Sequence, residues 1–387
     1  MTGKERALRT FSGLPTDRVP YCEQSVCCKV ASEILGRPAF TGGGLLRMKE
    51  GEIWLRSDED HDAFVHQVLD DLIACARFLG WDMITVPWRH SLRPTKKLDD
   101  RTFLYGDEND WFAVYRYHPE TDVFDCVDDT LKRQGLKAIP RVVDATEQSL
   151  KEGGRPVGGA YSDFEFLVEK VGSELAVASP AGFIAIPLRT EWLETLIEEP
   201  SLVHRYLNAV CEMNLIAMEE TAKKGAACFW GGGDLANESG VLYGVHRFRT
   251  FLLPHLQRLA AASRRLQVPY FFRTDGNIWS IASILFEEVG FQGYGEIDVD
   301  AGMDLIALRQ RFPNLILWGG ISCGKDLVFN TPQQIADTVH FLLERLAPHG
   351  RLFFGSSNAI HIGVPTENFL AMTQSVRQFR CRLIGSY

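Results

Sequence analysis

Short apolar runs that end in polar residues or glycine alternate along this chain with longer amphipathic stretches, and this alternation constrains the fold most. The pattern is typical of parallel strands covered by helices. Eight runs show it: 82–87, 155–160, 182–187, 226–230, 269–273, 293–296, 315–318 and 351–354. Helices are predicted at 191–224 with a break near Pro200, and at 248–266, 277–289, 304–312, 331–347 and 366–380. Eight parallel strands predict a closed (β/α)8 barrel.

The predicted organisation is a single domain, with an N-terminal extension over 1–80 and the barrel over 81–387. Residues 18–26 are expected to form a strand outside the barrel's strand count. A long crossing through Gly42–Gly44 then leads to a helix at 62–80. Residues 102–118 carry alternating aromatic side chains on either side of a polar turn, which predicts a β-hairpin inserted into the barrel.

Charge and cysteine content exclude several classes of protein. The net charge is −9 and no run of five like charges occurs, so no broad surface for nucleic acid or for a membrane is expected. The nine cysteines are scattered without a CxxC pair, which indicates reduced thiols in a cytosol. No segment approaches the roughly 18 apolar residues of a membrane span, and no signal peptide is evident. A cytoplasmic enzyme is the expectation.

Candidate functional residues follow from the barrel itself, because the loops after the strands converge on one pocket at its C-terminal face. The polar and aromatic residues just past the predicted strands are Trp88, Arg89, Tyr161, Asp163, Arg189, Asp234, Arg273, Asp275, Asn277, Glu296, Asp298, Ser322, Cys323, Ser356, Asn358 and His361. This ring is rich in both acids and arginines.

Three of these residues suggest a metal site. Glu296, Cys323 and His361 follow the sixth, seventh and eighth runs and have side chains of the types that bind zinc. Each also has a structural interpretation, as a salt-bridge partner, a small turn residue and a loop hydrogen-bonding group respectively.

Asp234, Asp275 and Glu296 are the predicted catalytic acids. Asp234 follows Gly231–Gly233, and three glycines allow the backbone to approach a ligand closely. A helix-capping role is the alternative for Asp234.

The predicted substrate-binding set contains cations, aromatic rings and amides. Arg189 and Arg273 at strand ends need carboxylate partners, supplied by the protein or by a substrate. Asn277 is also placed to cap the helix that follows it. The full set is Trp88, Arg89, Tyr161, Arg189, Arg273, Asn277 and Asn358. Trp88, Tyr161, Trp230 and Trp279 suit a planar ligand, and packing is their alternative role.

Several motifs, in the same order along the chain, resemble those of the uroporphyrinogen decarboxylase superfamily. They are Lys4–Arg6 followed by Arg9–Pro20, then Gly319–Gly324, Asn330–Ile335 and Gly363–Asn368. The resemblance runs from residue 4 to about residue 380. It implies a (β/α)8 barrel and often a homodimer.

The departures from the decarboxylases concern the groups that those enzymes use. Glu23-Gln-Ser-Val-Cys27 stands where the decarboxylases carry Arg-Gln-Ala-Gly-Arg, and Arg89 falls where they place the aspartate that binds pyrrole nitrogens. Phe166 and Asn358 stand in place of a tyrosine and a histidine. These four departures disfavour decarboxylation of porphyrinogens, although the fold that the resemblance implies is the same.

Methyltransferases of the same superfamily hold zinc with a His-x-Cys pair and a further Cys, and the matching positions here are Arg273, Asp275 and Asn358. Related enzymes that demethylate aryl methyl ethers use acid-containing metal sets. A replacement set can then come from Asp234, Asp275, Glu296, Cys323 and His361. A second set, Glu219, Asp234 and His255, ranks lower because Glu219 is expected toward the barrel's opposite end.

The leading hypothesis is an enzyme that moves a methyl group from an O- or N-methyl small molecule to a corrinoid carried by a partner protein, with zinc at the barrel mouth. The alternatives are a decarboxylase acting on a porphyrinogen or a smaller acid, and a non-catalytic barrel that binds a tetrapyrrole or corrinoid.

Overall fold

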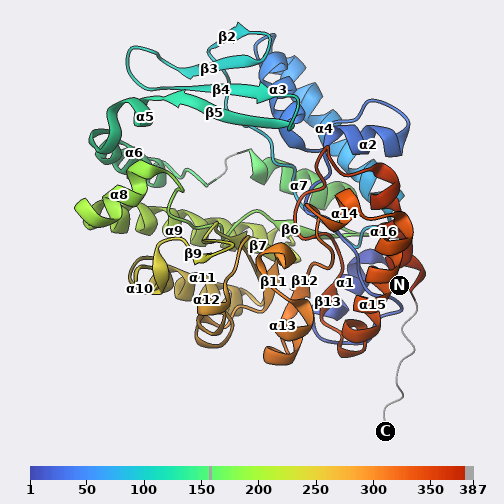
Figure 1. Ribbon diagram of the computed structural model, residues 1–387. Helices are drawn as coiled ribbons and strands as arrows, with labels where there is room; N and C mark the ends of the chain where they lie inside the picture. Colours follow the sequence, from blue (N-terminus) through green and yellow to red (C-terminus); the bar gives the residue numbers. More distant parts are fainter. Residues whose placement is uncertain (157–158, 380–387) are drawn as a thin grey trace.

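Seven short parallel strands form one curled sheet at the centre of the chain, in the computed structural model that describes residues 1–156 and 159–379 (Figure 1). In spatial order the strands are β1 (Met83–Ile84), β6 (Ala176–Ser179), β7 (Cys228–Gly232), β10 (Tyr270–Arg273), β11 (Gly293–Gly295), β12 (Ile316–Trp318) and β13 (Leu352–Phe353). Each strand pairs in parallel with its neighbour, as a (β/α)8 barrel requires.

An extended segment at residues 20–22 closes the gap between the first and last strands. Tyr21 bridges Phe354 in parallel, and the Cys22 amide donates to the Phe354 carbonyl at 3.2 Å. On the other side the Asp82 amide donates to the Tyr21 carbonyl at 2.8 Å. The prediction that residues 18–26 lie outside the barrel is therefore wrong, since this segment takes the place of the eighth strand.

The Asp82 carboxylate holds this closing segment in place. It accepts hydrogen bonds from the guanidinium groups of Arg6 and Arg18 and from the Tyr21 amide, the last at 2.8 Å. Asp82 is fully buried, so each of its oxygens depends on these partners. The carboxylate thus links α1 (Gly3–Phe11), the closing segment and β1.

Two of the eight predicted strands are also wrong. Run 155–160 precedes helix α7 (Ala160–Val171), and residues 157–158 lie outside the described residues. The real strand is β6, whose small residues Ala176–Ser179 give a weak apolar signal. Run 182–187 is a loop that touches the barrel through one bridge, Phe183 to Gly232.

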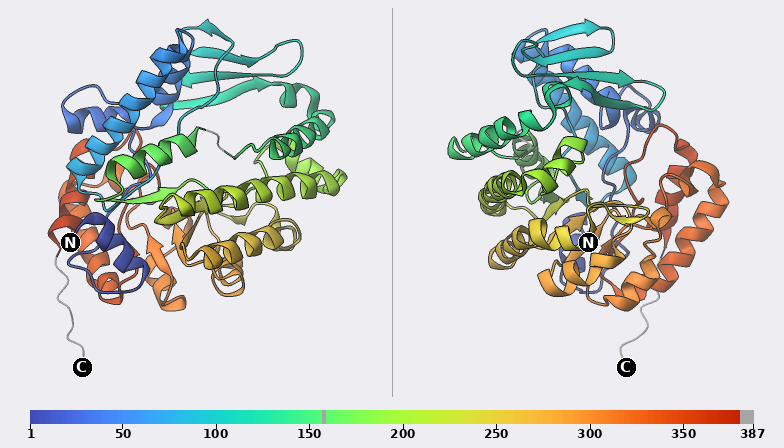
Figure 2. Two further views of the ribbon diagram at one scale, coloured as in Figure 1. Left: turned by 180° about the vertical axis from the view of Figure 1, so that it is seen from behind. Right: turned by 60° about the vertical axis from the view of Figure 1, so that its left-hand side comes forward.

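Helices surround the strands on the outside of the barrel (Figure 2). Their bounds are α4 (Asp58–Leu79), α7, α8 (Thr190–Glu198), α9 (Pro200–Lys223), α10 (Gly244–Arg247), α11 (Leu253–Leu266), α12 (Trp279–Ser283), α13 (Leu305–Arg311), α14 (Asp326–Phe329), α15 (Pro332–Leu346) and α16 (Thr366–Gln378). The helical turns η2 (Phe248–Leu252) and η3 (Ile284–Val289) extend α11 and α12, and η4 (Val299–Ala301) and η5 (Ala347–His349) are short. All six predicted helical regions are confirmed, including the break at Pro200, where α9 begins.

A four-stranded antiparallel sheet forms a separate layer beyond the barrel, at the top of Figure 1. Its strands are β2 (Lys96–Asp99), β3 (Thr102–Gly106), β4 (Phe112–His118) and β5 (Val123–Asp129), so the predicted hairpin is confirmed as β3–β4. The chain continues through α5 (Thr130–Gln134), η1 (Gly135–Ala138) and α6 (Ile139–Lys151). A smaller pair, β8 (Ala236–Asn237) and β9 (Gly240–Val241), follows β7.

The predicted crossing between residues 27 and 61 is helical instead. It contains α2 (Cys28–Leu35) and α3 (Gly43–Trp54). Helix α3 begins within Gly42–Gly44, residues that are unfavourable in helices and so gave no helical signal. Met48 of α3 packs with Phe103, Tyr105 and Phe124 of the antiparallel sheet, so α3 lies between this sheet and the barrel.

The barrel interior is filled by its own apolar cluster, which includes Met83, Trp230, Phe271, Trp318 and Phe353. Phe11 of α1 packs against this cluster from below. The eight cysteines within the described residues are free thiols. Among the helices of residues 1–156 and 159–379, none combines the length and the hydropathy that crossing a bilayer needs.

We predict that Asp82→Asn lowers the free energy of unfolding by about 3–5 kcal/mol, because it removes the only anion that the partly buried Arg18 has within the described residues and one of the two anions of the buried Arg6, which keeps Asp17. Chemical denaturation followed by circular dichroism measures the change. Asp110→Asn is the matched control, since Asp110 pairs with Arg141 on the surface and such pairs contribute about 0–1 kcal/mol. Equal effects of the two substitutions would contradict the role assigned to Asp82.

Candidate functional site

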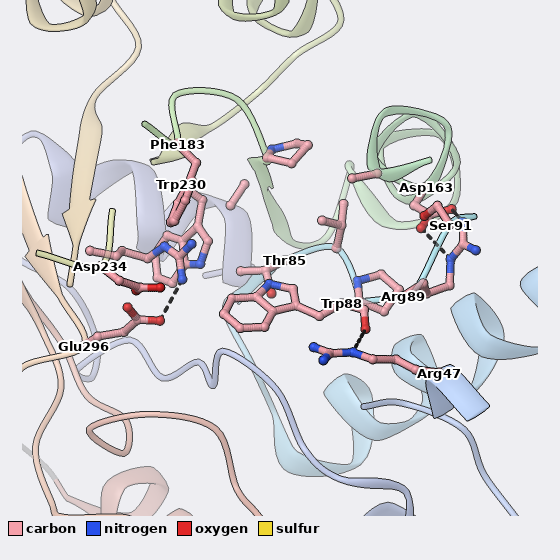
Figure 3. A pocket seen from close by; sticks show the side chains of 16 residues that line it. Arg47, Thr85, Trp88, Arg89, Ser91, Asp163, Phe183, Trp230, Asp234 and Glu296 are labelled. Atoms are coloured by element: carbon pink, nitrogen blue, oxygen red, sulfur yellow. Dashed lines mark hydrogen bonds and ion pairs between the residues drawn. The ribbon is translucent and has the colours of Figure 1, made fainter. Parts of the chain in front are cut away.

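A cavity of about 320 Å³ lies at the C-terminal ends of the barrel strands (Figure 3). Segments far apart in the chain build it, namely α3, the residues after β1, the end of β6, Trp230 of β7 and the ends of β10 and β11. Its lining residues include Arg47, Thr85, Trp88, Arg89, Asp163, Phe183, Trp230, Asp234, Arg273 and Glu296. Five acids or cations predicted from the strand ends therefore line one cavity: Arg89, Asp163, Asp234, Arg273 and Glu296.

Glu296 is turned into the cavity by an unusual backbone conformation. Gly295 before it lies on the inner side of β11, because a Cβ there would meet the Trp318 ring at 2.7 Å. Strand alternation would then direct Glu296 outward. Instead Glu296 has a φ of 58°, in the left-handed region, and its side chain reaches Arg273 inside the mouth. Burial raises the pKa of Glu296 to about 7, so this carboxyl exchanges a proton near neutrality.

Arg273 lies between two indole rings. Its guanidinium carbon is 5.7 Å from the Trp88 ring centre and 5.1 Å from that of Trp230, and Nη1 donates to Glu296 Oε1 at 2.7 Å. Its buried Nε has no hydrogen-bond partner within the described residues. Stacking with aromatic rings and one carboxylate together hold this cation in the cavity wall.

Asp234 lies at the outer edge of the cavity, and Figure 3 shows its carboxylate close to that of Glu296. Its side chain is exposed to solvent at this edge, yet desolvation by the surrounding protein raises its pKa, and the nearby Arg273 partly opposes this. The three glycines before it have a packing role. They allow close packing inside the protein, since a Cβ on Gly232, which has a φ of 131°, would meet the Arg273 carbonyl at 2.1 Å.

A wider apolar cavity of about 1040 Å³ adjoins the first one and shares Phe183 and Asp234 with it. It lies among α6, α9 and the loop of residues 183–188. Asp234 is therefore the acid at the junction between a small inner chamber and a larger outer one.

Asp275 is not among the residues that line either cavity. Asn358 donates to its Oδ1 at 2.7 Å. Burial, with Asp234 and Asp298 nearby, raises the pKa of Asp275 to about 6. Asp275 thus adds negative charge near Glu296, while Asn358 is already engaged by a protein group.

Arg89 lines the cavity but is fully paired with protein carboxylates. Its Nε and Nη2 donate to Asp163 at 2.9 Å each, and Nη1 donates to Glu50. Glu50 also accepts from His61 and from the His90 amide. Arg89 therefore joins α3, α4 and α7 below the cavity, and this geometry favours internal pairing over substrate binding.

Three other predicted substrate-binding residues have structural positions. Tyr161 is buried in α7 outside the cavity lining. Arg189 donates to Asp129 at 2.9 Å and thereby fastens the antiparallel sheet to the barrel. Asn277 accepts from the Trp279 amide at 3.2 Å, which is the helix-start role considered for it.

Neither predicted metal set is assembled. Both ring nitrogens of His361 are engaged, one with the Cys323 carbonyl at 3.1 Å and one with the Gly363 amide at 3.1 Å. Burial raises the pKa of Cys323 to about 11, which disfavours a thiolate. Of the second set, Glu219 is paired with Arg265 on the surface, away from Asp234. Among the described residues no three His, Cys, Asp or Glu side chains are grouped to hold a metal ion, so these side chains do not fit zinc.

Sequence reasoning missed two buried polar residues that directly follow the closing segment, Glu23 and Gln24. Glu23 is fully buried and accepts from the amide and hydroxyl of Ser356, and burial raises its pKa to about 7. Gln24 is 3% exposed, and neither atom of its amide has a hydrogen-bond partner within residues 1–156 and 159–379. The altered motif at residues 23–27 could have revealed them, because the same changes that remove the arginines of the decarboxylases introduce Glu23.

Comparison with known proteins finds one family model and two curated relatives that are similar to this chain. The family model described as uroporphyrinogen decarboxylase (URO-D) matches residues 188–379. Two curated relatives, the uroporphyrinogen decarboxylases of Anaeromyxobacter dehalogenans (strain 2CP-C) and Anaeromyxobacter sp. (strain Fw109-5), are each 25% identical over 248 and 252 residues. Each match covers 63% of this chain and 65% of the relative, so it spans less than two thirds of the relatives' length.

A solved structure agrees with the fold over almost the whole chain. The methyltransferase from Methanosarcina mazei superposes with a TM-score of 0.61 at 15% sequence identity, covering 98% of this chain and 99% of that one. At this identity the likeness concerns the fold, and it supports the barrel described above.

We predict that Glu296→Gln changes how stability depends on pH. Because the pKa of Glu296 is raised from about 4.5 to about 7, the native state binds more protons than the unfolded state within that window. Stability from this group is therefore lost as pH rises, and the wild type should lose roughly 3 kcal/mol relative to the variant between pH 4.5 and 7. Denaturant titrations across this range measure the difference. Glu23 and Asp275 titrate in both proteins, so parallel curves would contradict the assignment.

Proposed function

We propose that this chain, a divergent member of the uroporphyrinogen decarboxylase superfamily, transfers a methyl group from an O- or N-methyl small molecule to a corrinoid carried by a partner protein. The observation that carries the proposal is a buried carboxyl with a pKa of about 7, Glu296, beside Arg273 in a small aromatic-walled cavity at the barrel mouth.

The difficulty in this reaction is the leaving group, because an ether or amine leaves poorly as an anion. A carboxyl that is partly protonated near pH 7 can donate its proton to the oxygen or nitrogen as the bond to the methyl carbon breaks. Arg273 stabilises the carboxylate that remains after this donation, since its Nη1 already contacts Glu296. Glu296 is thus the proposed general acid and Arg273 its electrostatic partner.

The rest of the cavity orients the donor and admits the acceptor. Trp88, Phe183 and Trp230 offer apolar surfaces for a planar donor. A reduced corrinoid, when bound, supplies the nucleophile that takes the methyl group. The outer cavity of about 1040 Å³ meets the inner one at Asp234 and leaves room there for an acceptor to approach. We derive no step through zinc, because the side chains present do not fit it.

The decarboxylase alternative is weaker on three observations. Glu23 replaces the first arginine of the decarboxylase motif and is sealed against Ser356. Arg89, at the position of the pyrrole-binding aspartate, is bound to Asp163 and Glu50. The inner cavity of about 320 Å³ lies at the low end of the 300–1,000 Å³ typical of ligand sites, which suits a single-ring molecule better than a tetrapyrrole.

We predict that the purified protein, supplied with chemically reduced cobalamin or a corrinoid protein, forms methylcobalamin from at least one member of a panel of methoxyarenes and methylamines. Spectral change of the cobalamin measures the rate. Glu296→Gln should lower kcat by about 10²–10⁴-fold, and the wild-type rate should fall as pH rises through about 7, because the acid form is then lost.

Glu287→Gln is the matched control, since Glu287 pairs with Arg311 on the surface far from the cavity lining. Full activity in Glu296→Gln, or a rate that rises through pH 7, would reject the general-acid role. Transfer from no donor in the panel would reject the proposed reaction.

We also predict that uroporphyrinogen is not converted to coproporphyrinogen above background, because the arginines and the aspartate that the decarboxylases use are absent. Chromatography of the oxidised porphyrins after anaerobic incubation measures this. Measurable turnover would restore the decarboxylase alternative.

A further inference from the structure

Arg47 is a cation of the cavity that sequence reasoning did not identify. It projects from α3, is half-buried and lines the inner chamber. Its only hydrogen bond within the described residues runs from Nε to the Trp88 carbonyl at 3.1 Å. Figure 3 shows the outer end of its guanidinium, with both Nη atoms, directed past Trp88 into the cavity.

The other two arginines of the cavity wall are paired. Arg89 has Asp163 and Glu50, and Arg273 has Glu296. Arg47 makes no ion pair within residues 1–156 and 159–379, although burial penalises its charge and lowers its pKa. A guanidinium withdrawn from water without an anion is unfavourable unless a ligand supplies one.

The acids nearest to Arg47 are committed elsewhere. Asp122 accepts from the Leu45 amide at 2.7 Å and from the Tyr117 hydroxyl at 3.2 Å. Glu50 is bound by Arg89, His61 and the His90 amide. Asp122, Tyr115 and Glu50 favour the charged form of Arg47 from a distance, without contacting its Nη atoms. The Nη atoms therefore remain available to a molecule in the cavity.

The cavity thus has two chemically different ends. In Figure 3 Arg47 lies on one side of the Trp88 indole, and Asp234 and Glu296 lie on the other. Between them the walls are aromatic and apolar, with Trp88, Phe183 and Trp230. A ligand that matches both ends carries an anion near Arg47, a planar body, and a hydrogen-bond-accepting heteroatom near Glu296.

We propose that Arg47 binds the carboxylate of the methyl donor, and that the donor is a small aromatic acid with its O- or N-methyl group at the end remote from the carboxylate. This inference rests on the proposed function for the methyl group, whereas the carboxylate subsite rests on Arg47 alone. A bidentate contact between the two Nη atoms and the carboxylate would complete the hydrogen bonding of the guanidinium.

Calorimetric titration of the full-length protein with methoxybenzoates and with the corresponding neutral methoxybenzamides tests the subsite. The wild type should bind at least one acid about tenfold to a hundredfold more tightly than its amide. Arg47→Met should remove this preference and leave the affinity for the amide unchanged, while Arg47→Lys should retain part of it. Thermal melts establish that each variant is folded.

Lys49→Met is the matched control. Lys49 lies on the same helix and pairs with Glu52, outside the cavity lining, so the variant removes one positive charge from α3 without touching the cavity. Its preference for the acid should equal that of the wild type. An equal loss in both variants would show a general charge effect and overturn the subsite.

The binding assay contains no methyl acceptor, so its outcome is separate from that of the methyl-transfer assay. An Arg47-dependent preference for acids without methyl transfer supports the subsite and rejects the proposed reaction. Methyl transfer with equal use of acids and amides supports the reaction and rejects the subsite. The proposal is also overturned if no acid binds more tightly than its amide, or if Arg47→Met weakens both ligands equally.

Discussion

The buried carboxylate of Asp82 is the interaction on which the barrel depends. Seven strands curl but do not meet, and the closing segment has only a few backbone hydrogen bonds with which to bridge them. Asp82 supplies the missing restraint by joining Arg6, Arg18 and the Tyr21 amide at one point. Because an unpaired charge at this depth is costly, the three partners must stay together whenever the chain is folded.

Closure of the barrel also builds the floor of the site. The residues that follow Tyr21 in the closing segment enter the mouth, where Glu23 meets Ser356 after β13 and the Gln24 carbonyl accepts from Thr85 after β1. The Gln24 amide lies near Glu296 and partly opposes the rise in the pKa of that carboxyl. The strand ends supply acids and Arg273, whereas the N-terminal region supplies Gln24 and Arg47. A segment that appeared to be an extension of the barrel therefore contributes Arg47 to the cavity lining and Gln24 to the surroundings of Glu296.

The sequence predicted those features that depend on local periodicity. The helices and most strands follow from alternating hydrophobicity, and the strand-end rule brought Asp234, Arg273 and Glu296 to one cavity. Strand β6 was not predicted because Ala and Ser give little apolar signal. Helix α3 was not predicted because glycines lie at its start. Arg47 could not be found by the strand-end rule, since it reaches the cavity from a helix packed against another sheet. Spacing alone could not show that both ring nitrogens of His361 are engaged, because its backbone partners depend on loop conformation.

The backbone conformation of Glu296 favours a functional explanation of this acid over a purely structural one. A left-handed conformation at a non-glycine residue costs about 1–2 kcal/mol, and burial of its carboxyl adds a further penalty. A salt-bridge partner for Arg273 could be placed without that strain, for example by a side chain from an unstrained strand position. The fold instead directs one strained acid against an arginine that stacks on two indoles, at the wall of a cavity. Strain, burial and a proton that exchanges near neutrality coincide at this residue, and that combination is expected where stability is given up for chemistry.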